Sequence, residues 1–370
     1  MRLSLITSLL AAACFENLSM LTSYSAPLSI YQLAVAPAQD YSIWYNSARK
    51  YNREERALKH RIAAVIMAAG KSTRMKSALP KAAHLICGKP VTRHVIDACL
   101  EAGVGEVVVV VGHEAETVIS ALGADVSYAY QTEQLGTGHA CIQALPSIGE
   151  DISDIVVLPG DTPLITAEAL LAMISAHTSQ SNAATLLTAV LDDASHYGRI
   201  VRDDTGAVLK IQEAKDADEQ TLSIREINTS IYCFNRQLLA EKLALLKTDN
   251  AQCEYYLTDV VELLNASGSR VGAVIADNHE DVLGINNRVE LAHLSSIMRR
   301  RVLDKLMLSG VTVVDPATTY IDCDVQIGAD TTVQPCTIIE RGSRIGANCE
   351  VGPFARLSGV TMADGTKGAS

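Results

Sequence analysis

The sequence predicts a protein of the α/β fold class, with a doubly wound domain followed by a short parallel β-helix. Two observations carry most of this prediction. From residue 62 onward, continuous apolar runs alternate with helix-like segments, which is the pattern of strands and their covering helices. From residue 321 onward, a hydrophobic residue recurs at every sixth position, which is the repeat that builds a parallel β-helix.

Three apolar runs have the character of strands that are covered on both faces: Ile62–Ile66, Glu106–Gly112 and Ile155–Leu158. Between the first two, Pro90–Ala102 has the spacing of a helix with proline in its first turn. Alternating strands and helices imply a Rossmann-like, doubly wound sheet. Such a sheet binds its ligand in a crevice at the carboxyl ends of the strands.

The turn after the first strand is the most informative segment, and its sequence at 67–81 is MAAGKSTRMKSALPK. Its small residues leave backbone N–H groups open to an anion, and Arg74, Lys76 and Lys81 add three cations. The GKS within it is not a P-loop, because that motif requires glycine where Val65 stands. The segment predicts a phosphate-binding turn, with an ordinary strand–helix turn as the alternative.

The C-terminal part follows a different pattern. A long helix is expected over Arg288–Leu308, in which the arginines at 299–301 would form a solvated face. The hydrophobic residues that then recur at intervals of six are Ile321, Ile327, Val333, Ile339, Ile345, Val351 and Leu357. Neither helix nor strand periodicity gives six, so a parallel β-helix is predicted. In the left-handed form known from such repeats three hexapeptides make one coil, so this stretch supplies about two coils.

Length and composition narrow the class of protein. With 370 residues, one large domain and a smaller one are the default. The apolar content of 48% suffices for a core, and the net charge of −11 argues against a nucleic-acid partner. The nine cysteines are odd in number and include no C-x-x-C pair. That pattern favours reduced thiols in the cytoplasm over disulfides or a zinc site.

Seven motifs in order make the chain similar to the sugar nucleotidyltransferases. The turn at 67–81 resembles their signature, and the other six are Gln131–Ala140, Pro159–Leu164, Tyr197–Arg199, Glu226–Thr229, Glu254–Asp259 and Gly284–Arg288. The set most resembles the bacterial bifunctional N-acetylglucosamine-1-phosphate uridylyltransferase/glucosamine-1-phosphate acetyltransferases, over about Ile62–Leu357. The resemblance implies Mg²⁺-dependent uridylyl transfer from UTP to N-acetylglucosamine-1-phosphate. The products would be pyrophosphate and UDP-N-acetylglucosamine, a precursor for cell wall and lipopolysaccharide.

The resemblance places a nucleotide and metal site at the strand ends. It implies that Asp161 and Asn286 bind Mg²⁺, an ion that takes oxygen ligands and phosphates. Lys81 would grip the triphosphate and Arg74 would stabilise charge on it, so these two are the expected catalytic residues. The rest of the nucleotide site would be Met67, Ala68, Ala69, Gly70, Gln131, Gly136, Thr137 and Gly160. Without the resemblance, Asp161 could be a turn-forming residue and the cations solvated surface groups.

The resemblance also implies a sugar-phosphate site. Glu213 would accept hydrogen bonds from sugar hydroxyls and Asn228 would bond the acetamido group or a hydroxyl, with Gly198 beside them. Glu254 and Tyr256 would line the same side. Taken alone, Glu213 has the surroundings of a surface charge. No nucleophilic residue or general base is needed, because the sugar phosphate is already ionised at neutral pH.

Departures from the family pattern concern glycines and the C-terminal part. Ser72 and Ser230 stand where glycine is usual, and Ser72 would tighten its turn if that position requires a positive φ. Ser358 stands where the family has an arginine for the acetyl acceptor, and the later residues of acetyl transfer would lie beyond Ser370. We therefore expect no acetyltransferase activity.

The expected organisation is an N-terminal extension over 1–61, a nucleotidyltransferase domain over 62–290, a linker helix over 291–312 and a truncated left-handed β-helix over 313–370. Met1–Cys14 resembles a signal segment that ends at a lipoprotein-like Ala-Ala-Cys. Export would separate a UTP-dependent enzyme from its nucleotide, so a cytoplasmic extension or a misassigned start codon is favoured. No run reaches the roughly 20 apolar residues of a membrane span.

Other functions stay open. The same chemistry could serve another hexose-1-phosphate with UTP or dTTP, since specificity rests on few contacts. The chain could also be a weakly active scaffold or regulatory subunit, or a structural fragment, assembled through its β-helix. The intact metal ligands and phosphate-binding cations favour an enzyme. A homotrimer formed through the β-helix is the expected assembly.

Overall fold

The computed structural model describes residues 61–194 and 197–368. The chain divides into two compact units, Met1–Arg56 and Ala57–Ser370, and the described residues all belong to the second. The N-terminal extension and its signal-like segment lie outside the described residues.

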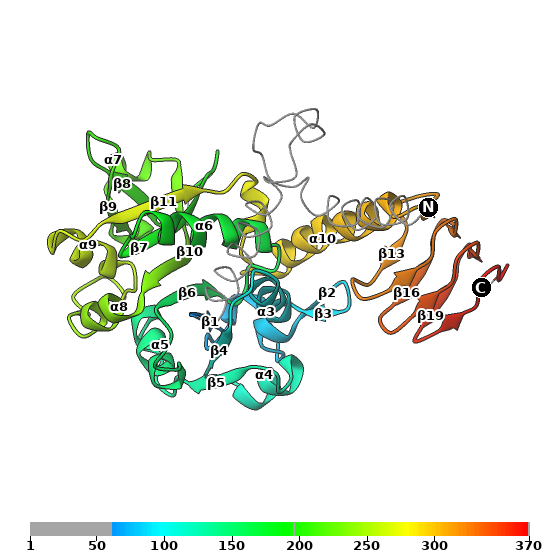
Figure 1. Ribbon diagram of the computed structural model, residues 1–370, viewed down its shortest axis with the longest axis horizontal. Coiled ribbons are helices and arrows are strands. Elements are labelled where there is room, and N and C mark those ends of the chain that lie inside the picture. Colours follow the sequence, from blue (N-terminus) through cyan, green and yellow to red (C-terminus); the bar gives the residue numbers. More distant parts are fainter. Residues whose placement is uncertain (1–60, 195–196, 369–370) are drawn as a thin grey trace, which may run out of the picture. The chain divides into compact units, whose positions relative to one another are not determined.

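The parallel half of the central sheet contains the strands that the apolar runs predicted (Figure 1). In spatial order its strands are β6 (Asp154–Pro159), β1 (Ile62–Met67), β4 (Glu106–Val111) and β5 (Ser127–Tyr130), of which β5 had no predicted run. Alternate side chains of a strand point to opposite faces. In β1, Ile62, Ala64 and Ile66 join one buried cluster, and Ala63 and Val65 join the other. Both faces of the sheet are therefore covered, as the continuous apolar run indicated.

The other half of the nine-stranded sheet is mixed. Its strands are β10 (Glu226–Asn235), β7 (Ala184–Val190), β11 (Val271–Ile275), β8 (Arg199–Arg202) and β9 (Val208–Gln212). β10 runs antiparallel to both β6 and β7. The predicted fold class is confirmed, but the direction of β10 was not predicted, because periodicity gives the burial of a strand and not its direction.

Helices cover both faces of the sheet. The first cluster receives α3 (Val91–Glu101), α4 (Ala115–Leu122) and α6 (Ala167–Ser179), and the second receives α5 (Thr137–Ala144), α8 (Arg236–Leu243) and α9 (Asp259–Ala266). The helix expected at 90–102 is thus confirmed with one residue fewer at each end.

The shorter elements connect these layers. They are η2 (Thr73–Met75), η3 (Lys81–Ala83), β2 (Leu85–Ile86), β3 (Lys89–Pro90), η4 (Leu145–Ser147), η5 (Ala214–Asp216), α7 (Glu219–Leu222) and η6 (His279–Val282). In the described ranges, no helix has both the length and the apolarity that a membrane crossing requires.

The long helix α10 (Arg288–Leu308) has the bounds that the sequence predicted. The expectation that its arginines form a solvated face is wrong for two of the three. Arg301 donates to the Leu164 carbonyl at 2.8 Å, and the Arg299 guanidinium lies 4.3 Å from the centre of the Tyr320 ring. The helix is therefore fixed by polar contacts at both ends of this arginine run.

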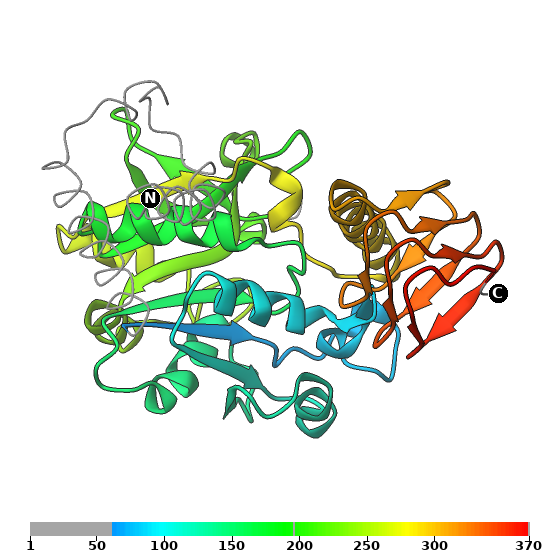
Figure 2. The same cartoon turned by 45° about the vertical axis from the view of Figure 1, so that its right-hand side comes forward.

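The hexapeptide region forms a short left-handed parallel β-helix beside α10 (Figure 2). Its strands are β12 (Thr312–Val313), β13 (Tyr320–Ile321), β14 (Gln326–Ile327), β15 (Thr332–Val333), β16 (Ile338–Glu340), β17 (Arg344–Ile345), β18 (Glu350–Val351), β19 (Arg356–Ser358) and β20 (Thr361–Met362). They pair as three parallel sheets of three strands. Over residues 321–357 the strands β13 to β19 make about two coils, as expected, and β12 and β20 on either side of that stretch bring the total to three.

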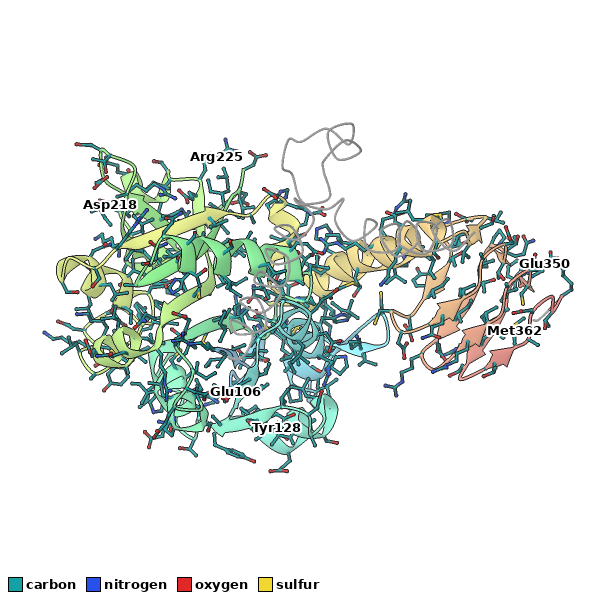
Figure 3. All side chains as sticks on the ribbon, viewed as in Figure 1. Glu106, Tyr128, Asp218, Arg225, Glu350 and Met362 are labelled. Atoms are coloured by element: carbon teal, nitrogen blue, oxygen red, sulfur yellow. The ribbon has the colours of Figure 1, made fainter. Side chains whose placement is uncertain are left out.

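The extra coil is explained by two strands that are out of step with the repeat of six. Val313 pairs with Val333 across an insertion, and Met362 pairs with Ile345 one position early. The inward side chains of all the coils form one buried cluster with Leu303 of α10. Figure 3 shows these side chains, with Glu350 and Met362 labelled in the last coil.

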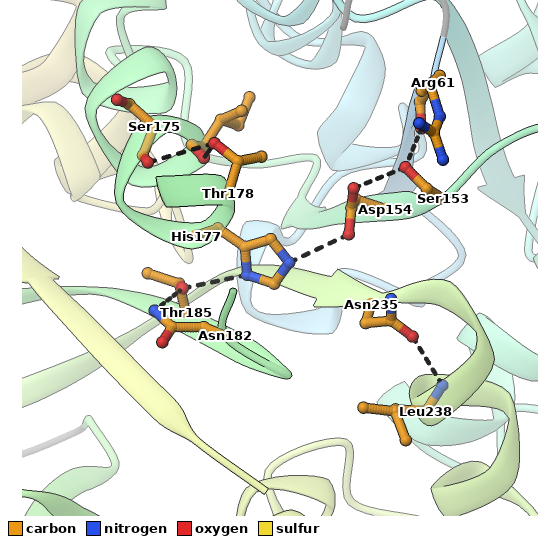
Figure 4. A network of polar contacts seen from close by, with 11 residues as sticks. Arg61, Ser153, Asp154, Ser175, His177, Thr178, Asn182, Thr185, Asn235 and Leu238 are labelled. Carbon is orange, nitrogen blue, oxygen red and sulfur yellow. Dashed lines mark hydrogen bonds and ion pairs between the residues drawn. The ribbon is translucent and has the colours of Figure 1, made fainter. Parts of the chain in front are cut away.

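At the amino-terminal end of β6, a buried histidine joins α6 to the sheet (Figure 4). His177 Nε2 lies 3.2 Å from Asp154 Oδ1, and His177 Nδ1 lies 3.1 Å from Thr185 Oγ1. The Ser153 hydroxyl donates to Asp154 at 2.7 Å. Burial raises the pKa of Asp154, but the bonds from His177 and Ser153 outweigh it and hold that pKa below its ordinary value.

Candidate active site

A cleft of about 400 Å³ opens at the carboxyl ends of β1 and β6, where a doubly wound sheet is expected to bind its ligand. Its lining residues are Met67, Ala68, Gly70, Lys71, Ser72, Thr73, Arg74, Lys81, Ala82, Thr92, Thr137, Pro159, Gly160, Asp161, Ser230 and Asn286. Most of the nucleotide and metal residues expected from the sequence are among them. Ala69, Gln131 and Gly136 lie outside this lining.

The turn after β1 is held in shape by its own polar groups. The Ala68 N–H donates to the Val110 carbonyl at 2.9 Å, which extends the strand pairing past the end of β1. Ser72 has a φ of 52°, so the condition under which serine tightens the turn is met. Its hydroxyl donates to the Gly70 carbonyl at 3.3 Å and accepts from the Lys81 N–H at 3.4 Å. These bonds partly offset the strain and tie the turn to Lys81.

Two pairs of side chains meet across the cleft. Lys81 Nζ forms an ion pair with Asp161 Oδ2, and the two side chains are 21% and 23% exposed. Arg74 Nη2 donates to Asn286 Oδ1 at 2.7 Å, between residues 212 positions apart in the sequence. The fold thus brings the four expected phosphate and metal residues to one place, with Lys81 and Asp161 partly shielded from water and Arg74 exposed at the edge of the cleft.

Backbone contacts fix the position of Asp161. The Gly160 N–H donates to the Met67 carbonyl at 2.9 Å, and the buried Thr92 hydroxyl donates to the Gly160 carbonyl at 2.6 Å. A Cβ at Gly160 would lie 3.0 Å from both the Met67 oxygen and the Thr92 hydroxyl, so the close approach favours glycine. On the other side, the Ile285 N–H donates to the Asp161 carbonyl at 3.0 Å.

Asp161 and Asn286 fit a hard divalent cation. Both offer oxygen, the ligand that Mg²⁺ prefers, and each is already paired with a cationic group. The described ranges contain no group of three or more His, Cys, Asp or Glu side chains able to hold a metal ion. The protein would therefore supply two oxygen ligands, and phosphate and water the rest, which is common for Mg²⁺.

The expected base-binding residues lie beside the start of α5. Gln131 is 4% exposed, and its Nε2 lies 3.0 Å from the Gly136 carbonyl and 3.2 Å from His139 Nδ1. Among the described residues, its Oε1 has no hydrogen-bond partner and is free to accept from a base. Thr137 begins α5 after Gly136 as N-cap, and its hydroxyl accepts from the Leu257 N–H at 3.1 Å.

Gly198 and Asn228, both expected at the sugar site, are neighbours. The Asn228 N–H donates to the Gly198 carbonyl at 2.9 Å. The side-chain amide of Asn228 is engaged within the protein, since its Nδ2 donates to the Tyr232 hydroxyl at 2.8 Å and its Oδ1 accepts from the Ser230 N–H at 3.1 Å. A sugar contact through Asn228 would therefore share or replace one of these bonds.

Glu213 lies in a half-buried acidic group. Burial raises its pKa, and Asp216 and Asp259 add to the effect, although a bond from Thr258 at 3.1 Å opposes it. The Tyr256 hydroxyl lies 3.4 Å from Asp216 Oδ2. Glu213 and Tyr256 are thus brought to the same region, and the interpretation of Glu213 as a plain surface charge does not fit its burial.

Most of the expected nucleotide-site residues line the cleft, whereas the expected sugar-site residues do not. None of the five sugar-side residues lines the 400 Å³ cleft. Glu254 lies against the turn before α5 that contains the expected base-binding residue Gly136, since a Cβ at Gly136 would come within 2.8 Å of the Glu254 Cβ. Sequence reasoning missed Ser230 and Thr92 as lining residues. For Thr92 the available signal was a hydroxyl next to the apolar face of the predicted helix.

Comparisons with known proteins match both parts of the chain. Residues 64–252 match the family described as MobA-like NTP transferase domain, and residues 318–365 match the bacterial transferase hexapeptide (six repeats). The chain is 48% identical to the bifunctional protein GlmU of Brevibacillus brevis over 305 residues, and 48% identical to that of a Geobacillus species over 303 residues. Each alignment covers 82% of this chain and 66% of the relative.

The bifunctional protein GlmU of Exiguobacterium sibiricum is 46% identical over 301 residues, which are 81% of this chain and 67% of that protein. The chain therefore spans about two thirds of the length of the curated relatives it matches.

Proposed function

This chain belongs to the GlmU family and contains a MobA-like NTP transferase domain, and we propose that it transfers a uridylyl group from UTP to N-acetylglucosamine-1-phosphate. The products are pyrophosphate and UDP-N-acetylglucosamine, a precursor for bacterial cell wall and lipopolysaccharide. The observation that supports this most is the meeting of two cations and two oxygen ligands in one cleft at the strand ends.

The reaction needs positioning more than acid–base chemistry. An oxygen of the sugar phosphate attacks the α-phosphorus of UTP, the bond from that phosphorus to the bridging oxygen breaks, and pyrophosphate leaves. No proton has to be removed, because the attacking phosphate is already ionised. The chain therefore has to align the two phosphates and neutralise their charge.

Lys81 and Arg74 are the proposed catalytic residues, and they exchange partners when the nucleotide binds. In the structure, Lys81 pairs with Asp161 and Arg74 with Asn286. Phosphate oxygens form strong charge-assisted bonds with both cations, which frees the two oxygen ligands. The family uses a divalent metal ion, and we propose Mg²⁺, which when bound would neutralise phosphate charge.

The remaining residues provide specificity in this proposal. The backbone of 67–70 lies along the nucleotide, and Gln131 Oε1 accepts from the base. Gly198, Glu213 and Asn228 contact the sugar, with the acetamido group at Asn228. When the sugar binds, it replaces or shares a bond that the Asn228 amide makes to Tyr232 or Ser230.

Assembly and location are part of the same proposal. The β-helix forms a homotrimer with two further copies, as hexapeptide repeats favour. The enzyme acts in the cytoplasm, because UTP is supplied there.

Pyrophosphate release tests the proposed function. The purified full chain is incubated with Mg²⁺ and each pairing of UTP or dTTP with N-acetylglucosamine-1-phosphate or glucose-1-phosphate. We expect release with UTP and the acetylated sugar, at a kcat/KM at least about tenfold above the other pairs, since a few pocket contacts supply that much discrimination.

Release that is faster with glucose-1-phosphate would keep the chemistry and reject the sugar. Absence of release with every pair, from chain that unfolds cooperatively, would reject the enzyme and favour a β-helix scaffold.

A further inference from the structure

Asn286 lies in the segment between Ile285 and α10, and one side chain fixes its backbone. Glu290 Oε2 accepts from the Asn286 N–H at 2.6 Å, and Glu290 Oε1 accepts from Asn287 Nδ2 at 2.6 Å. Both oxygens of this carboxylate are thus bonded to the two residues that precede the helix. A charged acceptor makes each of these bonds stronger than a neutral one would be.

Glu290 is itself held by the cap of α10. Asn287 is the N-cap, and its Oδ1 accepts from the N–H groups of Val289 and Glu290 at 2.9 and 3.0 Å. In an ordinary capping box the glutamate at this position bonds the N–H of the cap residue. Here it bonds the N–H one residue earlier, on Asn286. The first turn of α10, its N-cap Asn287 and the candidate metal ligand Asn286 are therefore linked by hydrogen bonds to one another.

The same turn of α10 is tied to the other side of the cleft. Arg288 Nε donates to the Met75 carbonyl at 3.2 Å, and Met75 belongs to the short helix that carries Arg74. The Ile285 N–H donates to the Asp161 carbonyl at 3.0 Å. The start of α10 is thus a fixed frame against which Asp161, Arg74 and Asn286 are placed.

We propose that Glu290 is a positioning residue for the metal–nucleotide site, acting by holding the backbone of Asn286 so that its side chain lines the same cleft as Asp161. This inference rests on the proposed function of the cleft. It adds a residue that touches neither nucleotide nor metal, and that lies on the helix leading to the β-helix. Groups that orient metal ligands in this way typically contribute 10–100-fold to metal affinity.

The test measures the binding of Mn²⁺ to the full chain in the presence of UTP. The electron paramagnetic resonance signal of the free ion reports how much Mn²⁺ is unbound. Glu290→Ala removes both bonds, and we expect at least about tenfold weaker Mn²⁺ binding. Glu290→Gln keeps an oxygen for the Asn286 N–H, and we expect a loss below about threefold. A large loss of Mn²⁺ affinity in Glu290→Ala with a small loss in Glu290→Gln would show that Glu290 acts by its hydrogen bonds and not by its negative charge.

The control is Asn235→Ala. Asn235 is the N-cap of α8 and accepts from the Leu238 N–H at 3.1 Å. It lies at the end of the sheet away from the cleft, pairing with Asp154. Loss of this cap should lower the unfolding midpoint, while Mn²⁺ affinity should remain that of the unaltered chain.

Retained Mn²⁺ affinity in Glu290→Ala would overturn the inference while leaving the proposed function intact. An equal loss in Glu290→Gln would also overturn it, because charge and not position would then be responsible. Failure of the unaltered chain to bind Mn²⁺ with UTP would reject the proposed function, and this inference with it.

Discussion

At the scale of single residues, the cleft is organised by paired charges. Lys81 pairs with Asp161 and Arg74 with Asn286, so the cations proposed to bind phosphate lie beside the proposed metal ligands. The motifs gave the identities of these four residues. They did not include Thr92 or Glu290, whose bonds go to the Gly160 carbonyl and the Asn286 N–H. A hydroxyl beside an apolar helix face and a glutamate three residues after an N-cap mark polar positions in the sequence, but they do not identify these partners.

Asp161→Asn tests the residue that joins the two halves of this arrangement. The substitution removes the carboxylate that would hold the metal, and we expect kcat/KM for uridylyl transfer to fall at least about 100-fold, or about 2.7 kcal/mol in the activation barrier. The control is Asp97→Asn, which removes a carboxylate that pairs with Lys89 and Arg93 outside the cleft. Activity within about twofold is expected for it, and equal losses in both variants would contradict the assignment.

At the scale of elements, the apolar runs and the repeat of six predicted strands, covering helices and coils at the correct places. Two features of the fold could not be predicted from those patterns. The direction of β10 depends on its partners β6 and β7, which lie far away in the sequence. The third coil of the β-helix depends on Val313 and Met362, whose spacing departs from six. Pattern reasoning fails where tertiary pairing, and not local periodicity, decides the outcome.

Alternating burial in the β-helix predicts unequal costs for two adjacent isoleucines. Ile339 is 0% exposed inside the coil and Ile338 is 37% exposed outside it. Ile339→Ala should lower the free energy of unfolding of the β-helix by about 2–5 kcal/mol through a cavity. Ile338→Ala should cost below about 1 kcal/mol. Urea unfolding of the two variants is the measurement, and similar losses would reject the coil register.

The network at the start of β6 predicts a pH dependence of stability. The pKa of Asp154 is lower in the folded chain than in the unfolded one, so its contribution is complete above its unfolded pKa of about 4. It is lost as the pH falls through the lowered pKa of the folded state. Asp154→Asn should therefore destabilise the chain by about 1–3 kcal/mol at pH 6.

That difference from the unaltered chain should shrink as the pH falls below about 4. Urea unfolding from pH 3 to 7 checks this. A difference that does not change across the range would show that the carboxylate contributes through shape and not through charge.

At the scale of the whole compact unit, two connections run from the cleft to the β-helix. One is α10, which begins at the Asn286 frame and packs its end into the coils. The other is the β2–β3 hairpin, which follows Lys81 and whose Cys87 carbonyl accepts from the Cys323 N–H at 3.0 Å. The proposed phosphate-binding turn and the proposed metal ligands are thus each one element away from the first coil.

Gly88→Ala tests the hairpin connection. Gly88 has a φ of 78°, and a Cβ there would lie 2.4 Å from the Asp322 side chain. Gly206 is the matched control, with a φ of 86° and nothing within 4 Å of its Cβ position. In both alanine variants the left-handed backbone should lower the free energy of unfolding by about 1–2 kcal/mol. Crowding against Asp322 should lower it by about 1–3 kcal/mol more in Gly88→Ala. Equal unfolding midpoints would show that the hairpin does not rest on the coil.

The most direct test of the central claim is a crystal structure of the chain with Mn²⁺ and the α,β-methylene analogue of UTP, which cannot be cleaved between those phosphates. We predict an anomalous peak for Mn²⁺ within bonding distance of the Asp161 and Asn286 side-chain oxygens. Lys81 and Arg74 should then contact the phosphates and no longer pair with Asp161 and Asn286. A metal or triphosphate bound elsewhere, with the Lys81–Asp161 pair unbroken, would contradict the assignment of this cleft as the nucleotidyltransferase site.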